Sequence, residues 1–239
     1  LMDMDKVKKA ITKKTKAIIP VHFHGKVCDM ERLYHNIPDI WVVEDAAQAL
    51  GATYQGYKAG SLGTLGCFSF NFPKLMGAYG DAGAITVKDE GLFKELLLLR
   101  NHWNISQGSV RGEDYPQPKV MGWGWKSRMD NIQAAILNVK FKYLPWILRR
   151  REQIAGMYQR GFEQIEIQLP IMAENDIVQE YIINIPNRSK FKEFMDNKGV
   201  ELLIRDTTPN HKLKGLGLEH FNLPITERIA KNAVRLPCY

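Results

Sequence analysis

The chain has 239 residues, of which 45% are hydrophobic and 25% charged. This composition is that of an ordinary globular protein and excludes disordered, collagen-like and disulfide-stapled classes. The mean hydropathy is −0.29, and the longest apolar runs are far shorter than the roughly 18 residues that a membrane span needs. The formal net charge is +7, but the basic residues are dispersed, so we expect a phosphate-bearing small ligand rather than nucleic acid.

The cysteines are few and scattered. Cys28, Cys67 and Cys238 are odd in number and lack the spacing of metal ligands. We therefore expect neither a disulfide framework nor a metal site, and a reducing, cytoplasmic setting.

The first part of the chain alternates predicted strands with turns and helices. Short apolar runs predict strands at 17–23, 41–47, 65–70 and 82–87, and a helix is expected at 30–35. The run at 41–47 carries two acids near its end, as a buried parallel strand does when it delivers polar side chains at its carboxyl end. This order of elements predicts an α/β fold built on a parallel sheet.

Helical patterns dominate from Leu92 onward. After a Gly- and Pro-rich loop at 101–120, a helix is expected from Arg128 until Pro145 interrupts it. The remaining chain predicts a small α+β unit with helices at 146–162, 190–197 and 226–235 and strands at 181–185 and 200–204. We therefore expect two domains, residues 1–145 and 146–239.

Asp45 and Gln48 are the first candidates for chemistry. A carboxylate at the end of an apolar strand is partly desolvated and needs a cationic partner. Gln48 would share a helical face with Asp45 if a helix begins there, and its amide could donate to a neighbouring oxygen. The alternative is that Asp45 only caps a helix formed by the AAQAL segment, and the spacing leaves both interpretations open.

Lys74 and Ser69 are the second pair of candidates. Lys74 lies between Pro73 and two apolar residues, where a partly buried amine could attack a carbonyl group as a Schiff-base lysine does. Ser69 ends an apolar run, and its hydroxyl and the following turn could bind a phosphate. A solvated loop lysine is the alternative interpretation of Lys74.

In combination, these segments resemble the DegT/DnrJ/EryC1/StrS family of sugar aminotransferases, which are pyridoxal-phosphate enzymes of fold type I. The likeness rests on the strand-end acid followed by SFNFPK at 69–74 and GAYGDAG at 77–83. It extends over essentially the whole chain through TKAIIPVHFHG at 15–25, RNH at 100–102, RMDNIQAAIL at 128–137, PNH at 209–211 and LP at 236–237.

The resemblance implies a role for each candidate. Lys74 would bond covalently to pyridoxal phosphate and later carry the proton. Asp45 would pair with the protonated pyridine nitrogen, which makes the ring an electron sink. Gln48 would lie near the ring oxygen of the cofactor, and Ser69 would bind its phosphate.

The resemblance also implies a substrate and an assembly. An amino acid, by family habit glutamate, would give its amino group to the cofactor, and a ketone of a nucleotide-linked deoxysugar would receive it. His211 would approach the sugar from the small domain. Lys126, where the family often has Asn, would reach the cofactor phosphate of the neighbouring subunit in a homodimer.

Three alternatives remain open at this level. A dehydratase of the same family would carry histidine at the position of Lys74, and a related enzyme would make an aminated aromatic compound instead of a sugar. The third alternative is an inactive fragment or a regulatory pseudo-enzyme. Trp103 also departs from the family, because it stands where a glycine usually follows the RNH segment.

The N-terminal segment of the family precedes the TKAIIPVH motif and supplies a Gly-Thr phosphate loop and an aromatic residue that stacks on the cofactor ring. The resemblance therefore implies a large domain with an incomplete, mixed and mostly parallel sheet, followed by a small α+β domain. We expect this chain alone to bind pyridoxal phosphate weakly or not at all.

Overall fold

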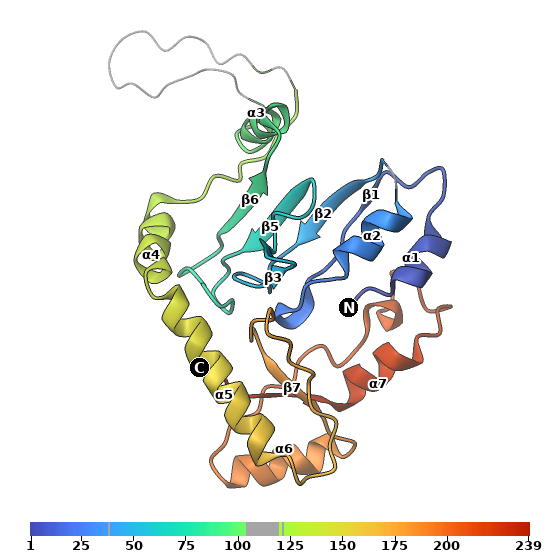
Figure 1. Cartoon of the computed structure of the whole chain (residues 1–239), viewed down its shortest axis with the longest axis vertical. Helices are drawn as coiled ribbons and strands as arrows, with labels where there is room; N and C mark the ends of the chain where they lie inside the picture. The colour runs from blue at the N-terminus through green and yellow to red at the C-terminus, as the bar shows by residue number, and fades with distance from the viewer. Residues whose placement is uncertain (38, 104–119, 121) are drawn as a thin grey trace. The chain divides into compact units, whose positions relative to one another are not determined.

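A computed structural model describes residues 1–37, 39–103, 120 and 122–239 (Figure 1). Most of the predicted loop at 101–120 therefore lies outside the described residues. The chain divides into two compact units, Leu1–Leu144 and Pro145–Tyr239. Each unit is described by itself below.

The first unit is built on a four-stranded sheet with the order β1-β2-β5-β6 (Figure 1). Parallel pairing joins β1 to β2 and β2 to β5, whereas β6 runs antiparallel to β5, so the sheet is mixed and mostly parallel. The strands are β1 (Ala17–Ile18), β2 (Trp41–Asp45), β5 (Leu65–Ser69) and β6 (Gly83–Val87). A separate antiparallel pair is formed by β3 (Thr53–Tyr54) and β4 (Tyr57–Lys58).

The first predicted strand is shorter than its apolar run. The strand β1 ends at Ile18, and Pro20, which has no N–H to donate, follows. The chain returns to the sheet at Val21, which forms an isolated parallel bridge with Asp45. His24 then takes a left-handed conformation, with φ of 57°, inside the 3-10 turn η1 (Phe23–Gly25).

Helices α1 (Met4–Ala10) and α2 (Met30–Asn36) begin at capping aspartates, Asp3 and Asp29, whose side chains accept backbone N–H groups of the first turn. They share an apolar cluster with the sheet, made of Met4, Ile18, Cys28, Met30, Leu33, Ile37 and Val42. The unit also contains α3 (Glu90–Leu99) and α4 (Asn131–Phe141). The sequence analysis did not predict α1 or the β3–β4 pair.

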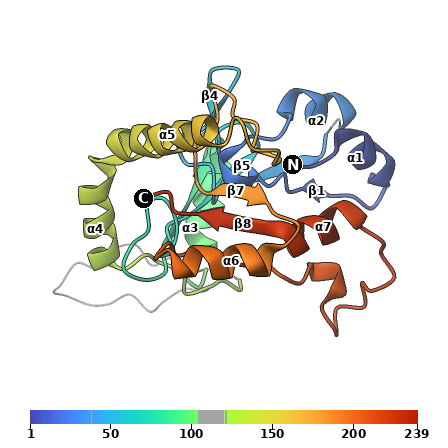
Figure 2. The same cartoon turned by 90° about the horizontal axis from the view of Figure 1, so that it is seen from below.

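The second unit packs helices on a two-stranded antiparallel sheet (Figure 2). Its elements are β7 (Tyr181–Asn184), α6 (Arg188–Asn197), η2 (Asn210–Lys212), α7 (Pro224–Asn232) and β8 (Ala233–Leu236), preceded by α5 (Leu144–Gly161). Pro145 lies at the second position of α5, where no intrahelical N–H is required. The core joins Ala155 of α5 to Tyr181, Ile183 and Val234 of the sheet.

Two predictions for this unit are wrong. The helix predicted at 226–235 ends at Asn232, and Ala233–Leu236 form β8 instead. All four residues of β8 are buried and paired with β7, and such non-local pairing overrides local helical periodicity. The strand predicted at 200–204 is reduced to a bridge between Leu203 and Arg235.

Candidate functional site

The candidate residues of the first unit gather where parallel strands end. Asp45 is the last residue of β2 and Ser69 the last residue of β5, and Asp45 stands in register with Cys67 of β5. On its other side, the Asp45 N–H donates to the Pro20 carbonyl at 3.0 Å, and the Asp45 carbonyl accepts the His22 N–H at 3.0 Å. Asp45 is thus held between two neighbouring segments at the carboxyl edge of the sheet.

The segment after Asp45 is a turn, so the alternative in which Asp45 only caps an AAQAL helix does not hold. The Asp45 Oδ1 atom accepts the Ala47 N–H at 3.1 Å, and the Gln48 Oε1 atom accepts the His24 N–H at 2.9 Å. A backbone N–H can only donate, so this contact fixes which end of the Gln48 amide faces His24. The amide NH2 group of Gln48 therefore points away from that backbone.

Ser69 and Lys74 belong to one connection between β5 and β6. The Ser69 Oγ atom accepts the Asn71 N–H at 3.3 Å. Two turns enclose Lys74, because its N–H donates to Asn71 O at 2.9 Å and its carbonyl accepts the Gly77 N–H at 3.0 Å. The Lys74 side chain is partly buried, rather than fully solvated.

The other two predicted site residues lie apart from this connection in the sequence. Lys126 is exposed and forms an antiparallel bridge with Asn101. His211, in the second unit, is buried, and its Nε2 atom is 2.9 Å from Glu227 Oε1. The contacts with His211, the Leu223 N–H and Lys212 hold the pKa of Glu227 below its usual value against a smaller effect of burial.

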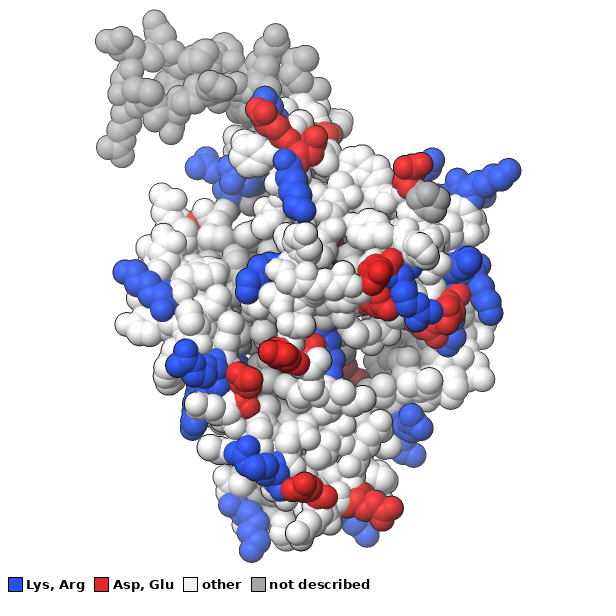
Figure 3. All heavy atoms as spheres, in the orientation of Figure 1, with Lys and Arg blue, Asp and Glu red and all other residues white. Residues whose placement is uncertain are grey.

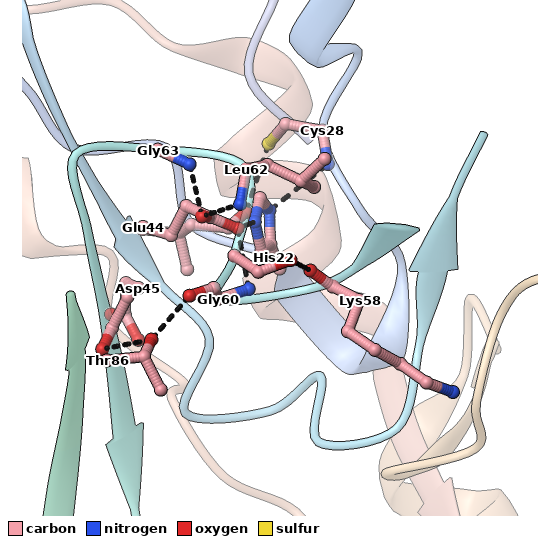
Figure 4. Close-up of polar contacts among 12 residues, drawn as sticks. His22, Cys28, Glu44, Asp45, Lys58, Gly60, Leu62, Gly63 and Thr86 are labelled. Carbon is pink, nitrogen blue, oxygen red and sulfur yellow. Dashed lines mark hydrogen bonds and ion pairs between the residues drawn. The ribbon is translucent and has the colours of Figure 1, made fainter. Parts of the chain in front are cut away.

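Sequence reasoning missed Glu44, the residue beside Asp45. Its side chain is fully buried, and Figure 4 shows it enclosed by His22 and the loop at 60–63. One carboxylate oxygen lies 2.9 Å from His22 Nε2 and accepts the Gly60 N–H at 2.7 Å. The other accepts the Leu62 and Gly63 N–H groups at 2.7 and 2.5 Å. A buried carboxylate with four donors is fully satisfied.

These donors keep Glu44 ionised. Burial raises the pKa of Glu44, but the hydrogen bonds from His22 and from the backbone of the loop at 60–63 outweigh it, so that the pKa is lowered. For His22, burial disfavours the imidazolium, whereas contacts with the side chains of Cys28 and Glu44 raise the pKa. The backbone of Cys28 acts in the opposite direction. Its N–H donates to Nδ1 at 3.2 Å, and Nδ1 can accept this bond only when it carries no proton. The geometry thus assigns the neutral ring with its proton on Nε2.

Glycine is required where the loop approaches the sheet. Gly60 has φ of +82°, and a Cβ atom there would lie 2.3 Å from the Phe68 ring. A Cβ atom on Gly66 would lie 2.1 Å from the Gly60 carbonyl oxygen. Thr86 of β6 adds a hydrogen bond to that same carbonyl. Glycine-rich loops often cradle phosphates, but here the backbone N–H groups bind a carboxylate of the protein itself.

The carboxylates also affect Cys67. Burial raises the pKa of the Cys67 thiol, and the nearby negative charges of Asp45 and Glu44 raise it further.

Within the described ranges, no group of three or more His, Cys, Asp or Glu side chains is arranged to hold a metal ion. Among the helices of those ranges, none combines the length and the apolar character that crossing a membrane requires.

Comparison with known proteins agrees with this architecture. Solved structures of sugar aminotransferases superpose on the chain, which confirms the expected fold class, that of the fold type I transferases. The sequence profile of the DegT/DnrJ/EryC1/StrS aminotransferase family matches residues 1–239, so the chain belongs to this family.

Among the relatives, a pleiotropic regulatory protein of Geobacillus stearothermophilus is 35% identical over 100% of the chain and 64% of its own length. A dTDP-3-amino-3,6-dideoxy-alpha-D-galactopyranose transaminase of Aneurinibacillus thermoaerophilus is 35% identical over 99% of the chain and 64% of its own length. The chain thus spans less than two thirds of the length of these relatives.

Among solved structures, S. venezuelae DesV in complex with a ketimine intermediate is 31% identical and has a TM-score of 0.88, covering 99% of the chain and 63% of DesV. The structure of ntda from Bacillus subtilis with bound cofactor PMP is 29% identical and has a TM-score of 0.87, covering 100% of the chain and 55% of that protein.

The Glu44 network makes a prediction for stability. A carboxylate whose pKa is lowered on folding stabilises the native state above its unfolded pKa of about 4.3, and this contribution disappears as the pH falls through the folded value. We expect Glu44→Gln to lower the free energy of unfolding at pH 7 by about 3 kcal/mol and to flatten its dependence on pH below about 5. Urea unfolding between pH 3 and pH 7 measures both effects.

Glu90→Gln is the matched control, because Glu90 lies exposed at the start of α3. It should leave the free energy of unfolding within about 0.5 kcal/mol of the original value. Equal acid sensitivity of the Glu44 variant and the unmodified chain would contradict an ionised, stabilising Glu44.

Proposed function

We propose that the protein is a pyridoxal-phosphate-dependent aminotransferase that moves an amino group from an amino acid, glutamate by expectation, to a ketone of a nucleotide-linked deoxysugar. The observation that carries the proposal is the position of Asp45 and Ser69 at the carboxyl ends of adjacent parallel strands, with Gln48 and Lys74 on the segments that follow. Ligands of open α/β sheets bind at this edge. Dideoxysugar and trideoxysugar transaminases among the relatives support the substrate class.

The side chains at this edge fit the chemical groups of pyridoxal phosphate. The Asp45 Oδ1 atom is bonded to the Ala47 N–H, and within the described chain Oδ2 has no hydrogen-bond partner, which leaves it for a pyridinium nitrogen. Gln48 offers an amide NH2 to a ring oxygen. Ser69 retains its hydroxyl hydrogen for a phosphate oxygen, because its Oγ atom acts as acceptor toward Asn71. The Lys74 amine can bond covalently to the aldehyde group of the cofactor.

Each residue then has a distinct task. When bound, the cofactor supplies an electron sink. Asp45 keeps the proton on the pyridine nitrogen and orients the ring, Gln48 donates to the ring oxygen, and Ser69 anchors the phosphate. Lys74 would hold the cofactor covalently through its amine, and as a free amine it would carry the proton that transamination moves between substrate and cofactor.

The distribution of charge supports anionic small-molecule substrates rather than nucleic acid. Figure 3 shows Lys and Arg side chains interspersed with Asp and Glu on the face that it displays, rather than gathered in one basic patch. The net charge of +7 favours binding of a nucleotide diphosphate and of the donor carboxylates through long-range attraction.

His211 is proposed to contact the sugar, with its imidazole oriented by Glu227. The cytoplasm suits the free thiols of Cys28, Cys67 and Cys238.

A homodimer is part of the proposal. Helix α4 exposes Ile132 and Val139, and their spacing of seven residues places them on one face of the helix. Tyr143, in the turn after α4, is exposed as well. Tyr79, whose backbone N–H binds Gln133 of the same helix, is also exposed. We infer that a second copy covers this apolar face, and that Lys126 then reaches the cofactor phosphate of the other subunit.

Regulatory function is the second candidate. Two relatives bear regulatory names, the pleiotropic regulatory protein and the erythromycin biosynthesis sensory transduction protein EryC1. The combination of Asp45, Gln48, Ser69 and Lys74 favours the enzyme, because a regulatory protein has no need of an amine at the strand edge. Lys74 also disfavours a sugar dehydratase, because a dehydratase of this family would carry histidine at that position. An aminated aromatic product is separated from an aminated sugar by identifying the product formed from a nucleotide-linked ketosugar and glutamate.

The first prediction from the proposed function concerns Lys74. With the protein expressed at the full length of its reading frame, pyridoxal phosphate should give a visible absorption band, and borohydride should fix the cofactor to residue 74, as read by mass spectrometry. Lys74→Ala should abolish the band and lower transamination by about 10³-fold. Lys88→Ala, an exposed lysine on the same unit, should change neither. Cofactor fixed at another lysine would overturn the assignment.

The second prediction concerns the donor role of Gln48. Gln48→Glu keeps an oxygen for the His24 N–H but removes the NH2 group. We expect the dissociation constant of pyridoxal phosphate to rise about tenfold, as measured by absorbance titration. Gln164→Glu, at an exposed position, tests the effect of added charge alone. An unchanged dissociation constant in the Gln48 variant would show that its amide does not donate to the cofactor.

The third prediction concerns the homodimer. Ile132→Asp places a charge in the proposed apolar contact, where burial without a partner is unfavourable. Sedimentation should show a dimer for the unmodified protein and a monomer for this variant. Leu216→Asp, on an exposed residue of the second unit, should remain dimeric. A dimer that survives Ile132→Asp would place the contact elsewhere.

A further inference from the structure

The loop at 70–82, which carries Lys74, is closed at its base by backbone hydrogen bonds. The Phe70 N–H donates to the Ala82 carbonyl, and the Phe70 carbonyl accepts the Ala78 N–H, both at 2.8 Å. Gly77 is in close contact with the chain, since a Cβ atom there would lie 2.1 Å from the Phe72 carbonyl oxygen. The loop is therefore held compact by its own backbone contacts, so that a displacement at one point is expected to be passed on to Lys74.

Helix α4 makes two contacts with this loop from one of its faces. The Gln133 Oε1 atom accepts the Tyr79 N–H at 2.8 Å, and Lys140 Nζ donates to the Gly77 carbonyl. Residues seven apart lie two turns apart on the same face, about 10 Å along the axis. The loop is thus attached to α4 at two separate points, both just after Lys74 in the chain.

The Gln133 contact is specific in its chemistry. The partner is a backbone N–H, which accepts no hydrogen bond, so the side chain at 133 must present an oxygen. The Gln133 amide also packs against Gly80, because its Nε2 atom lies 3.2 Å from the position of a Cβ atom there. Gln133 therefore fixes both the position and the orientation of the segment at 79–80 relative to α4.

We propose that Gln133 is a positioning residue that sets the reactive amine of Lys74 through the loop at 70–82, with Lys140 as the second attachment point. The inference rests on the proposed function, because it assigns the reacting amine to Lys74. The physical reason is that a displacement of about 1 Å in a reacting group can lower the rate by about 100-fold. Gln133 itself touches neither substrate nor cofactor in this assignment.

The test compares two variants of similar size in the protein expressed at the full length of its reading frame. Gln133→Glu keeps an oxygen for the Tyr79 N–H, whereas Gln133→Met removes it. Hydrogen exchange without cofactor reports the loop directly. We expect the Tyr79 amide to exchange about tenfold faster in the Met variant and at the original rate in the Glu variant.

Borohydride trapping of pyridoxal phosphate at residue 74 reports the amine. The initial trapping rate should fall about tenfold in the Met variant and recover in the Glu variant. Asn138→Met is the control, because it makes the same kind of replacement at an exposed position of α4 and should alter neither readout. Lys140→Met should add to the loss of trapping.

The outcomes separate the two levels of the proposal. Unchanged exchange of the Tyr79 amide in the Met variant would overturn the attachment itself. Faster exchange with an unchanged trapping rate would show that Gln133 serves only the fold, and would overturn the positioning role. If the unmodified protein traps no cofactor at Lys74, the proposed function fails together with the positioning role, while the exchange result still reports the attachment of the loop.

Discussion

The hydrogen bonding of the buried Glu44 carboxylate is the constraint on which the carboxyl edge of the sheet in the first unit depends. Four donors from two other segments converge on its two oxygens: the His22 ring and three backbone N–H groups of the loop at 60–63. These contacts join β2, the segment after β1 and the approach to β5. An ionised carboxylate in the interior is strongly unfavourable without such partners, so these segments must take their places together.

Asp45, the neighbouring residue, takes no part in this network and is the one proposed to contact the cofactor. Asp45 occupies the last position of β2, and its backbone bonds to the segments on either side keep it at the sheet edge. Gln48 is in turn oriented by the His24 backbone, whose left-handed conformation places the N–H toward it. The proposed site residues therefore lie at strand ends and on the turns that follow, whereas Glu44 beside them is buried.

The sequence predicts this arrangement unevenly. The strands at 41–47, 65–70 and 82–87 are recognisable because their apolar runs are local and continuous, and the order of motifs locates Asp45, Ser69 and Lys74. The helix through Arg235 was predicted wrongly, because the strand that forms there pairs with the distant β7. The spacing left a helix after Asp45 open, and the segment is a turn whose Gln48 side chain binds the distant His24 N–H. Glu44, His22 and Gln133 act through contacts 16 to 54 residues away, which local spacing cannot reveal. The Glu before Asp45 and the glycines at 60–66 were the available signals.

The adjacency of Glu44 and Asp45 also determines which sequence changes the strand β2 can accept. Successive side chains of a strand face opposite sides of the sheet, and here one side receives the Glu44 carboxylate and the other the Asp45 carboxylate. A slip of one residue exchanges the two faces. A single insertion or deletion between Trp41 and Asp45 would thus bury the aspartate and turn the glutamate outward, although the composition of the strand hardly changes. In this family, we expect variation in β2 to occur by substitution, with its length held constant.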